Sequence, residues 1–459
     1  MSTISSVNPA TGEPVESHTA HTPEQAADLV DRCHRAHRDW RFVPFARRSE
    51  LMRGAARQLD QRRDDLARTM ALEMGKPLAQ GRTEIDKCKW VCEYYADNAE
   101  RFLATEQRDL DGDRGLVVHN PLGVVLAVMP WNFPFWQVFR FAAPALMAGN
   151  GGVLKHASNV PGSALAIEEV FREAGFPEDI FRTLLIGGRD VRAVIEHPLV
   201  RAVTLTGSTP AGKSVAENAG RVLKKCVLEL GGSDPYIVLG DADVELAVQK
   251  CVASRLINTG QSCIAAKRFI VCEPAFEEFE RRYCEAFAAK TWGDPLEGDF
   301  DLGPLARQDL RDELHDQVQR SIAAGARCPV GGEIPDHRGA FYPATVLCES
   351  PEGSPGYNEE MFGPVASILR VKDADQAIEV ANDSIFGLGS AVFTSDLAEG
   401  ERIASQLIEA GACFVNDFVK SDPRMPFGGI KESGYGRELS DHGIKEFLNI
   451  KTVVVPASS

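Results

Sequence analysis

The stretch that decides the fold is Gly123-Val-Val-Leu-Ala-Val-Met-Pro-Trp-Asn-Phe-Pro-Phe-Trp-Gln-Val-Phe-Arg-Phe-Ala-Ala-Pro-Ala-Leu-Met-Ala-Gly149. It is apolar and long enough to cross a bilayer, but its three prolines would interrupt a single helix and its polar side chains would be costly in lipid. We therefore predict a buried strand at 123–128, a sharp turn, and a buried helix at about 135–147. Because buried polar groups need a partner or a purpose, Asn132, Gln137 and Arg140 become candidates for function.

The pattern of the chain changes at this stretch. Upstream, long amphipathic segments predict helices at 23–40, 46–74 and 84–103. Downstream, short β-branched apolar runs alternate with helix-like segments, the signature of βαβ units on a parallel sheet. A first series of strands is expected at 124–128, 152–154, 183–186, 202–206, 226–230 and 236–239, and a second at 269–272, 344–347, 365–371, 390–393 and 412–415. Helices at 274–289, 309–324 and 375–382 separate members of the second series. The sequence thus predicts two α/β domains in series, joined between about 231 and 243.

Composition narrows the class of protein. The chain has 459 residues, 44% hydrophobic and 25% charged, as in ordinary globular proteins. Its net charge of -16 opposes nucleic acid and anionic membranes, so neither is expected as a partner. The 11 cysteines are scattered, with no Cys-x-x-Cys pair, which favours a reducing cytosol over a disulfide framework or a structural zinc site. The N-terminus lacks the basic flank and apolar core of a signal peptide. We predict a cytoplasmic protein without a metal centre.

Residues 207–214, Gly-Ser-Thr-Pro-Ala-Gly-Lys-Ser, match the Walker A pattern of P-loop NTPases, and they follow a predicted strand and open a predicted helix. Pro210 argues against that function, because it removes a backbone N–H from a loop that should present such groups to phosphate. A P-loop NTPase stays an alternative of another class. The pattern also supports a weaker prediction, a helix N-terminus at Gly207 and Ser208 that can hold a diphosphate.

Three polar groups point to covalent chemistry. Cys263 ends the segment Asn258-Thr-Gly-Gln-Ser-Cys263, whose polar neighbours are unusual for a packed thiol, although a buried structural cysteine is the ordinary alternative. Glu229 ends a predicted strand before two glycines, at the sheet edge where active-site groups of α/β proteins gather. Asn132 lies in a rigid turn between two prolines at the end of a buried strand, and its amide there is a candidate oxyanion donor.

Six motifs together resemble the successive signatures of the aldehyde dehydrogenase superfamily, in order and spacing and over essentially the whole chain. They are Pro-Trp-Asn-Phe-Pro at 130–134, Thr-Gly-Ser at 206–208, Glu-Leu-Gly-Gly at 229–232, Gly-Gln-Ser-Cys at 260–263, Glu-Glu-Met-Phe-Gly-Pro at 359–364 and Pro-Phe-Gly-Gly at 426–429. The resemblance implies an α/β fold with two Rossmann-like parallel-sheet domains in series and a small β extension for oligomerisation. It implies a cofactor-binding domain at 1–103 and 122–231, a catalytic domain at 232–440, and an extension at 104–121 and 441–459.

The resemblance also implies a mechanism, the oxidation of an aldehyde to a carboxylate through a thiohemiacetal and a thioester. Cys263 is then the nucleophile, and Asn132 with the Cys263 backbone N–H stabilises the oxyanion. Glu229 activates the hydrolytic water, and Glu438 matches a distal proton-relay carboxylate, with a capping or surface glutamate as the alternative. Cofactor contacts carried over by position are Trp131, Lys155, Gly207, Ser208, Glu360 and Phe362.

The identity of the cofactor is predicted from Ser158. Members that prefer NAD usually carry a glutamate at this position, three residues after the lysine at 155, to bind the adenosine ribose. A carboxylate would repel a 2'-phosphate, whereas Ser158 can donate a hydrogen bond to it and Lys155 can neutralise it. NADP is therefore the expected cofactor, with NAD as the alternative.

The substrate is predicted from Arg140 and Ser421, which match substrate contacts of succinate-semialdehyde dehydrogenases. Residues 131–161 resemble the bacterial and cyanobacterial branch of that group. Arg140 is expected to pair with the far carboxylate of succinate semialdehyde, against the alternative of a structural salt bridge in the core. Two departures are informative: Ile257 replaces a further arginine of some relatives, and Ala265 replaces a second cysteine, so no redox disulfide is expected there.

Other functions stay open beside this one. General aliphatic and glutarate-semialdehyde dehydrogenases are the close competitors, and a non-catalytic protein on the same scaffold is a further alternative. The family's architecture implies that 115–121 and 450–455 form a small projecting sheet. Because exposed apolar strand edges are usually covered, a homodimer or homotetramer is expected.

Overall fold

The segment at 123–149 folds largely as its sequence predicts. In the computed structural model, which describes residues 2–456, strand β5 (Val124–Met129) leads through a turn into helix α5 (Trp136–Met147). Every residue of α5 is buried, because the helix is covered by the first sheet on one side and by helices α2 (Phe45–Gln61) and α4 (Leu78–Phe102) on the other. A helix that is largely apolar on every side is stable in water only when other elements cover it on every side.

The first large sheet has six strands in the order β19-β9-β8-β5-β6-β7, all parallel except β19 at its edge. Its strands other than β5 are β6 (Gly151–His156), β7 (Phe181–Thr183), β8 (Val200–Thr206), β9 (Lys225–Glu229) and β19 (Gly434–Tyr435). The accompanying helices are α1 (Pro23–Trp40), α3 (Arg63–Met74), α6 (Pro161–Glu173), the 3-10 turn η1 (Gly188–Asp190), α7 (Val191–Glu196), α8 (Thr209–Arg221) and α15 (Ser440–Lys445).

The second large sheet has seven strands in the order β12-β13-β14-β11-β10-β16-β17, parallel except for β12. They are β10 (Pro235–Val238), β11 (Arg268–Cys272), β12 (Arg327–Val330), β13 (Thr345–Cys348), β14 (Val365–Val371), β16 (Gly389–Phe393) and β17 (Ala412–Val415). The helices are α9 (Val244–Leu256), the 3-10 turn η2 (Ile257–Gly260), α10 (Glu273–Ala288), α11 (Gln308–Ala323), α12 (Pro355–Asn358), α13 (Ala374–Asn382) and α14 (Leu397–Gln406).

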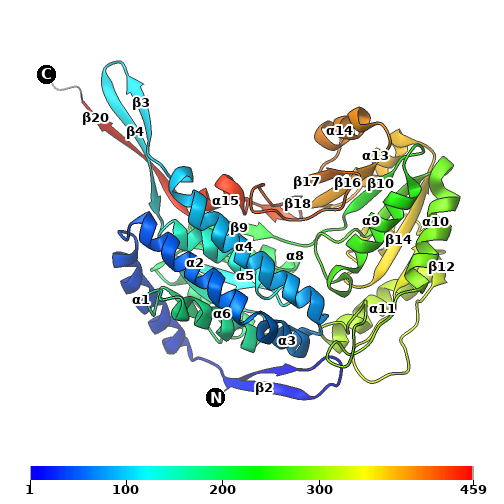
Figure 1. Cartoon of the computed structure of the whole chain (residues 1–459), viewed down its shortest axis with the longest axis horizontal. Coiled ribbons are helices and arrows are strands. Elements are labelled where there is room, and N and C mark those ends of the chain that lie inside the picture. Colours follow the sequence, from blue (N-terminus) through cyan, green and yellow to red (C-terminus); the bar gives the residue numbers. More distant parts are fainter. Residues whose placement is uncertain (1, 457–459) are drawn as a thin grey trace.

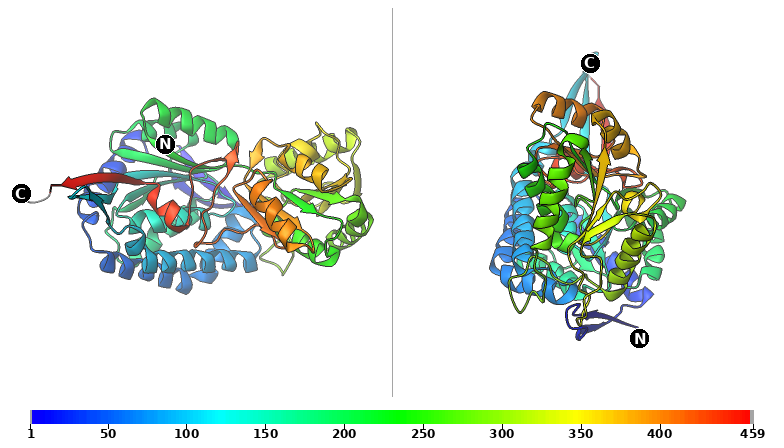
Figure 2. Two further views of the ribbon diagram at one scale, coloured as in Figure 1. Left: turned by 90° about the horizontal axis from the view of Figure 1, so that it is seen from above. Right: turned by 90° about the vertical axis from the view of Figure 1, so that its right-hand side faces the viewer.

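The two sheets lie side by side in separate lobes (Figures 1 and 2). Three smaller sheets complete the fold: β1 (Thr3–Val7) with β2 (Pro14–Thr19), β15 (Phe386–Gly387) with β18 (Ile430–Lys431), and β20 (Leu448–Val455) with β4 (Asp113–Pro121) and β3 (Glu106–Leu110). The last of these projects from the first lobe (Figure 1). The predicted fold class, two parallel-sheet α/β units in series with a small β extension, is confirmed.

The structure differs from the sequence prediction in a few elements. The helix expected at 46–74 is two helices, because Arg62 interrupts it and turns its guanidinium towards Glu169 and Glu173 of α6. The hairpin of β1 and β2 was not predicted, because its short polar strands lack apolar alternation. Within residues 2–456 no helix combines the length and apolarity that a bilayer span requires. Met1 and residues 457–459 of the predicted domain segments lie outside the described residues.

Candidate active site

Cys263 lies where two cavities meet. One, of about 470 Å³, is lined by side chains of α4, α5, α9 and the segment 418–427, with polar and charged residues from α4 and α5 beside apolar ones from α9. The other, of about 610 Å³, runs past the turn after β5, the start of α8 and the loop around Glu360. Cys263 lines both. A nucleophile in this position can be reached by a small substrate from one side and by a larger ligand from the other.

The loop that carries Cys263 is held in an uncommon backbone conformation. Asn258, Thr259 and Gly260 have φ values of 54°, 56° and 75°, in the left-handed region that side chains rarely adopt. Gly260 is required here, because a Cβ atom would lie 2.2 Å from the carbonyl oxygen of Gly363. Such conformations persist only when the surroundings over-determine them, and they cluster at active sites.

Two hydrogen bonds fix Asn132 against this loop, and a third braces the loop itself. The Asn132 Nδ2 donates to the carbonyl of Gln261 at 3.1 Å, while Asn258 Nδ2 donates to the carbonyls of Asn132 and Gln261 at 2.7 and 3.1 Å. Within residues 2–456 the backbone N–H of Cys263 donates to no protein group. One proton of the Asn132 amide and the Cys263 N–H are thus the donors available to an oxyanion on a substrate bound to Cys263.

The turn before α5 is supported from two sides. The Ala157 N–H donates to Nδ1 of His156, so Nε2 carries the ring proton and donates to the Pro134 carbonyl at 2.9 Å. Burial lowers the pKa of His156 to about 4, which keeps the ring neutral. On the other side Oε1 of Glu84 accepts the backbone N–H groups of Phe135 and Trp136, both at 2.9 Å.

The carboxylate of Glu84 is neutralised by the buried ammonium of Lys76. Lys76 forms an ion pair with Oε2 of Glu84 and lies 3.9 Å from the ring centroid of Phe133. The carboxylate therefore satisfies the first backbone N–H groups of α5 at the positive end of its dipole. The sequence did not reveal the roles of Lys76 and Glu84. Helical periodicity does place Glu84 on the same face as Cys88 and Val91, and a charged residue on that apolar face is the signal that could have revealed it.

The thiol of Cys263 is protonated in the free protein. Burial raises its pKa to about 12, and the nearby cations Lys267 and Arg140 only partly oppose this. Lys267 Nζ donates to the carbonyls of Ser262 and Cys263 at 3.0 and 2.7 Å, so it holds the backbone of the nucleophile. Cys263 must therefore lose a proton before it can attack a carbonyl.

Glu229, Glu438 and Arg140 form a buried group behind the thiol. Arg140 makes an ion pair with Glu438 and donates from Nη2 to Thr206 at 3.2 Å. Both carboxylate oxygens of Glu229 are buried without a hydrogen-bond partner in residues 2–456. Burial raises the pKa of Glu229, Arg140 lowers it and Glu438 raises it again. Glu229 lines neither cavity and lies against Gly428, so the structure does not bring it to Cys263.

The larger cavity brings together five of the predicted cofactor residues: Trp131, Gly207, Ser208, Glu360 and Phe362. Ser208 is the N-cap of α8, which already begins at Thr209, so residues 209–214 are helical and do not form the encircling loop of an NTPase. The rings of Trp131 and Phe362 meet edge to face at 5.8 Å between centroids.

The carboxylate of Glu360 and the backbone of Cys263 leave no room for a side chain at Gly231 or Gly232. Oε1 of Glu360 accepts the Gly232 N–H at 3.0 Å and lies 3.3 Å from Lys267. A Cβ on Gly231 would approach Oε2 of Glu360 to 2.3 Å, and one on Gly232 would approach the Cys263 carbonyl to 2.9 Å. The glycines let this carboxylate and the nucleophile lie against one strand end.

Lys155 and Ser158 lie outside the lining of that cavity, at the end of the neighbouring strand. Lys155 is on β6 opposite Val128 of β5, with 9% of its surface exposed, and Ser158 is exposed just beyond. Burial lowers the pKa of Lys155, and within residues 2–456 no carboxylate pairs with it. A buried ammonium without a carboxylate partner is costly unless a ligand supplies the anion.

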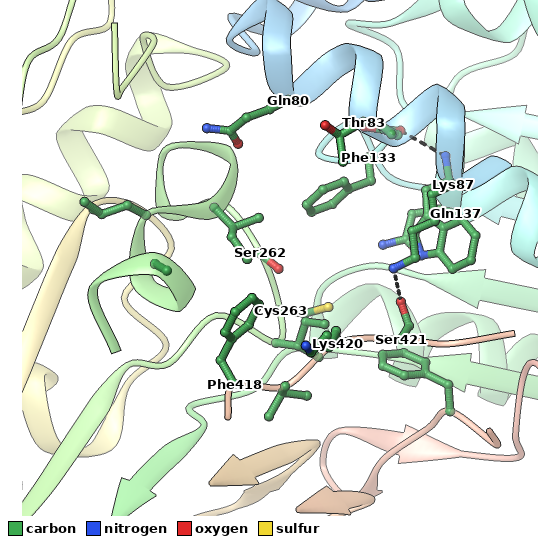
Figure 3. Close-up of a pocket in the computed structure, with 18 of the residues that line it drawn as sticks. Gln80, Thr83, Lys87, Phe133, Gln137, Ser262, Cys263, Phe418, Lys420 and Ser421 are labelled. Carbon is green, nitrogen blue, oxygen red and sulfur yellow. Dashed lines mark hydrogen bonds between the residues drawn. The ribbon is translucent and has the colours of Figure 1, made fainter. Parts of the chain in front are cut away.

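The smaller cavity contains Arg140 and Ser421, as predicted, and also Lys87, which the sequence did not reveal. Figure 3 shows Lys87 reaching Ser421, with the sulfur of Cys263 in the same pocket. The Lys87 Nζ donates to Ser421 Oγ at 2.7 Å. Arg140 lies over the ring of Phe427 at 4.7 Å. No group of three or more His, Cys, Asp or Glu that could hold a metal ion occurs in the described part of the chain.

A cysteine between two cavities, with amide donors beside it and a helix N-terminus at the larger cavity, is an arrangement expected of an enzyme that uses a thiol and a dinucleotide cofactor. The chain belongs to the aldehyde dehydrogenase family, whose model matches residues 1–453. The family recognised from the motifs is therefore confirmed.

The relatives are similar over nearly their whole length. A probable succinate-semialdehyde dehydrogenase, NADP(+), from Synechocystis is 51% identical over 98% of this chain and 99% of its own. Succinate-semialdehyde dehydrogenase 1, NADP(+), from Mycobacterium tuberculosis is 48% identical over the same shares. The crystal structure of succinic semialdehyde dehydrogenase from Streptococcus pyogenes with NADP+ superposes with a TM-score of 0.96 at 38% identity, covering 99% of this chain and 100% of that one.

The conformation of the nucleophile loop can be tested at Gly260. We expect Gly260→Ala to lower Tm by several degrees, since strain of about 1–3 kcal/mol is added, and to lower kcat/KM because Cys263 is displaced. Thermal unfolding and aldehyde oxidation measure the two effects. Gly353→Ala is the matched control, because Gly353 also has a positive φ (85°) but a Cβ there meets nothing within 4 Å. Equal losses in the two variants would contradict this role of Gly260.

Proposed function

We propose that this enzyme oxidises succinate semialdehyde to succinate, with NADP as the preferred electron acceptor and NAD as an alternative. The observation that carries the proposal is the Lys87 ammonium, hydrogen-bonded to the Ser421 hydroxyl, in the smaller of the two cavities that Cys263 lines. A cation there suits an aldehyde that bears a distant carboxylate. The names of the relatives agree with this substrate and cofactor. General aliphatic and glutarate-semialdehyde dehydrogenases are the competing functions.

In this proposal Cys263 Sγ attacks the aldehyde carbon and forms a thiohemiacetal. The negative oxygen accepts hydrogen bonds from Asn132 Nδ2 and the Cys263 N–H, and losing one such donor typically costs about a hundredfold in rate. Loss of hydride from that carbon leaves a thioester on Cys263. Water then adds to the thioester carbon, and cleavage of the C–S bond releases the acid and the thiol.

Glu229 is the proposed base for that water. Both of its carboxylate oxygens lack a hydrogen-bond partner among residues 2–456, and burial raises its pKa, so it is not committed to a permanent ion pair. In this proposal it moves towards the thioester to take a proton from the water. Glu438, which forms an ion pair with Arg140, is the proposed proton-relay carboxylate. Arg140 and Ser421 are also the proposed substrate contacts inferred from the family.

The dinucleotide is proposed to lie along the larger cavity. The residues present fit it, because the start of α8 at Gly207 and Ser208 can bind a diphosphate, and Lys155 lacks an anion that a 2'-phosphate would supply. Trp131, Glu360 and Phe362 are the proposed contacts of the nicotinamide half. When bound, the cofactor accepts the hydride.

We further propose that the protein works in the cytoplasm as a homodimer or homotetramer. The projecting sheet supports an oligomer, because the edge strand β20 exposes Ile450 and Val454, each by half or more of its surface. Residues 1–103 with 122–231 and 232–440 stay the proposed cofactor-binding and catalytic domains, with 104–121 and 441–459 as the oligomerisation extension.

The covalent route can be tested with Cys263→Ala. We expect it to abolish oxidation of succinate semialdehyde, followed by NADPH absorbance, while dinucleotide binding measured by fluorescence persists. Cys226→Ala is the control, because that thiol is on β9 of the first lobe and lines neither cavity. Undiminished turnover in Cys263→Ala would refute the mechanism. A wild-type kcat/KM for butyraldehyde that equals the value for succinate semialdehyde would refute the substrate.

Cofactor choice can be tested at Ser158. We expect Ser158→Glu to lower the ratio of kcat/KM for NADP over NAD by about tenfold or more, because the carboxylate repels the 2'-phosphate. Ser158→Gln, of equal size but neutral, should change the ratio much less. A wild-type preference for NAD, or equal effects of the two substitutions, would contradict the assignment.

Assembly can be tested on the face of β20. We expect Ile450→Glu with Val454→Glu to lower the mass measured by light scattering towards that of a single 50.0 kDa chain. Leu223→Glu is the control, since Leu223 is 95% exposed elsewhere on the first lobe. A wild-type protein that is already monomeric at micromolar concentration would refute the oligomer.

A further inference from the structure

The smaller of the two cavities that Cys263 lines has four cationic side chains in its wall, and three of them already have a carboxylate partner. Arg140 pairs with Glu438, Lys290 with Asp301 at 3.0 Å, and Lys420 with Asp417 at 2.6 Å. The fourth is Lys87. Among residues 2–456 no carboxylate lies within ion-pair distance of its ammonium.

The surroundings of Lys87 hold its ammonium in place without neutralising it. It lies on α4, donates to the buried hydroxyl of Ser421 at 2.7 Å, and sits 4.3 Å from the ring centroid of Trp136. The two carboxylates that precede Lys87 on the helix are engaged elsewhere: Asp86 pairs with Arg63 at 2.6 Å, and Glu84 is fully occupied. One of its oxygens binds Lys76 and the other accepts two backbone N–H groups of α5.

We propose that Lys87, positioned by Ser421 and Trp136, binds the far carboxylate of the substrate and is the residue that selects aldehydes carrying one. This inference rests on the proposed function and deepens it. An ammonium has three donors, and one is used on Ser421, so two remain for the incoming carboxylate. Figure 3 places this group and the sulfur of Cys263 in one pocket, so a short chain can have its carboxylate at Lys87 and its carbonyl at the thiol.

Arg140 then has a different task from the one inferred from the family. Its guanidinium pairs with Glu438, donates to Thr206 and lies over the ring of Phe427. Its positive charge is therefore already balanced by a carboxylate of the protein. Moving the guanidinium onto a substrate would leave Glu438 as a buried carboxylate without its partner, which is costly. Arg140 therefore contributes a positive field and shapes the pocket, while Lys87 carries the contact.

The test compares two four-carbon aldehydes, succinate semialdehyde and the uncharged butyraldehyde, in wild type and Lys87→Met. We expect the substitution to raise KM for succinate semialdehyde by about tenfold to a hundredfold, the usual loss for a hydrogen bond to a charged group. For butyraldehyde we expect kcat/KM to change by less than about threefold, because Met keeps the apolar contact with Trp136. Turnover of butyraldehyde also reports that the variant is folded.

Two further variants sharpen the result. Lys89→Met removes an equal charge from the same helix, but Lys89 pairs with Asp60 on the surface and should leave both substrates unaffected. Lys87→Arg should keep more of the preference than Lys87→Met. If wild type prefers succinate semialdehyde and Lys87→Met keeps that preference, the role of Lys87 is overturned while the proposed function stands. If wild type has no such preference, both are overturned.

A pH profile provides an independent readout. Burial lowers the pKa of Lys87 to about 8; Arg140 lowers it as well, while Cys88, Glu84 and Asp422 raise it. The ammonium is present below that pH and is lost above it, so KM of wild type for succinate semialdehyde should rise above about pH 8. KM for butyraldehyde should show no such rise, and Lys87→Arg should remove it. A flat KM for succinate semialdehyde in wild type up to pH 9.5 would overturn the assignment.

Discussion

The active site depends on the hydrogen bonds that join Asn132, Asn258 and Gln261. Asn132 follows a strand of the first sheet, whereas Asn258 and Gln261 precede a strand of the second. One buried amide, that of Asn258, therefore ties the carboxyl edge of the first sheet to the segment that leads into β11 of the second sheet, next to Cys263. The side-chain Nδ2 groups of Asn132 and Asn258 are paired in this contact, whereas the Oδ1 atoms of both have no hydrogen-bond partner among residues 2–456. The oxyanion donor and the thiol come from different lobes, and this contact sets their separation.

The charged groups near the thiol are of two kinds, those held in ion pairs within the protein and those without an ion-pair partner. Three buried ion pairs surround it, Lys76 with Glu84, Arg140 with Glu438 and Lys267 with Glu360. Each holds a structural feature: the start of α5, the floor of the substrate cavity and the backbone of Cys263. Among residues 2–456, Lys87, Lys155 and Glu229 have no ion-pair partner, and they are the proposed contacts of a carboxylate, a phosphate and a proton. Asp234, Arg255 and Arg268 are also buried without an ion pair, but each of them makes hydrogen bonds to the backbone. Lack of an ion-pair partner therefore indicates a ligand only where the group also borders a cavity or the proposed path of the reaction.

The sequence predicted the fold class, and its motifs marked the nucleophile, because close backbone approaches such as Gly260 on Gly363 restrict the residues that fit. It could not predict Lys87 or Glu84. Both lie on an amphipathic helix far upstream, and their role depends on which helix packs over the turn after β5. Arg140 shows the same limit: its spacing from Asn132 placed it in the cavity, but only the fold reveals that Glu438 already holds it.

The position of Glu229 constrains the order of events. Burial raises the pKa of the Cys263 thiol and also that of Glu229, which lies beside Gly428. A raised pKa disfavours the ionised form of a carboxyl, and only the ionised carboxylate can take a proton from a thiol or from water. The proposed role of Glu229 as a base therefore requires it to move away from this position and towards Cys263. In its present position Glu229 is balanced between two neighbours, since the cation of Arg140 lowers its pKa and the carboxyl of Glu438 raises it. The absence of a Cβ on Gly428 lets the carboxyl lie against that residue, because a Cβ there would approach its Oε1 to 2.7 Å.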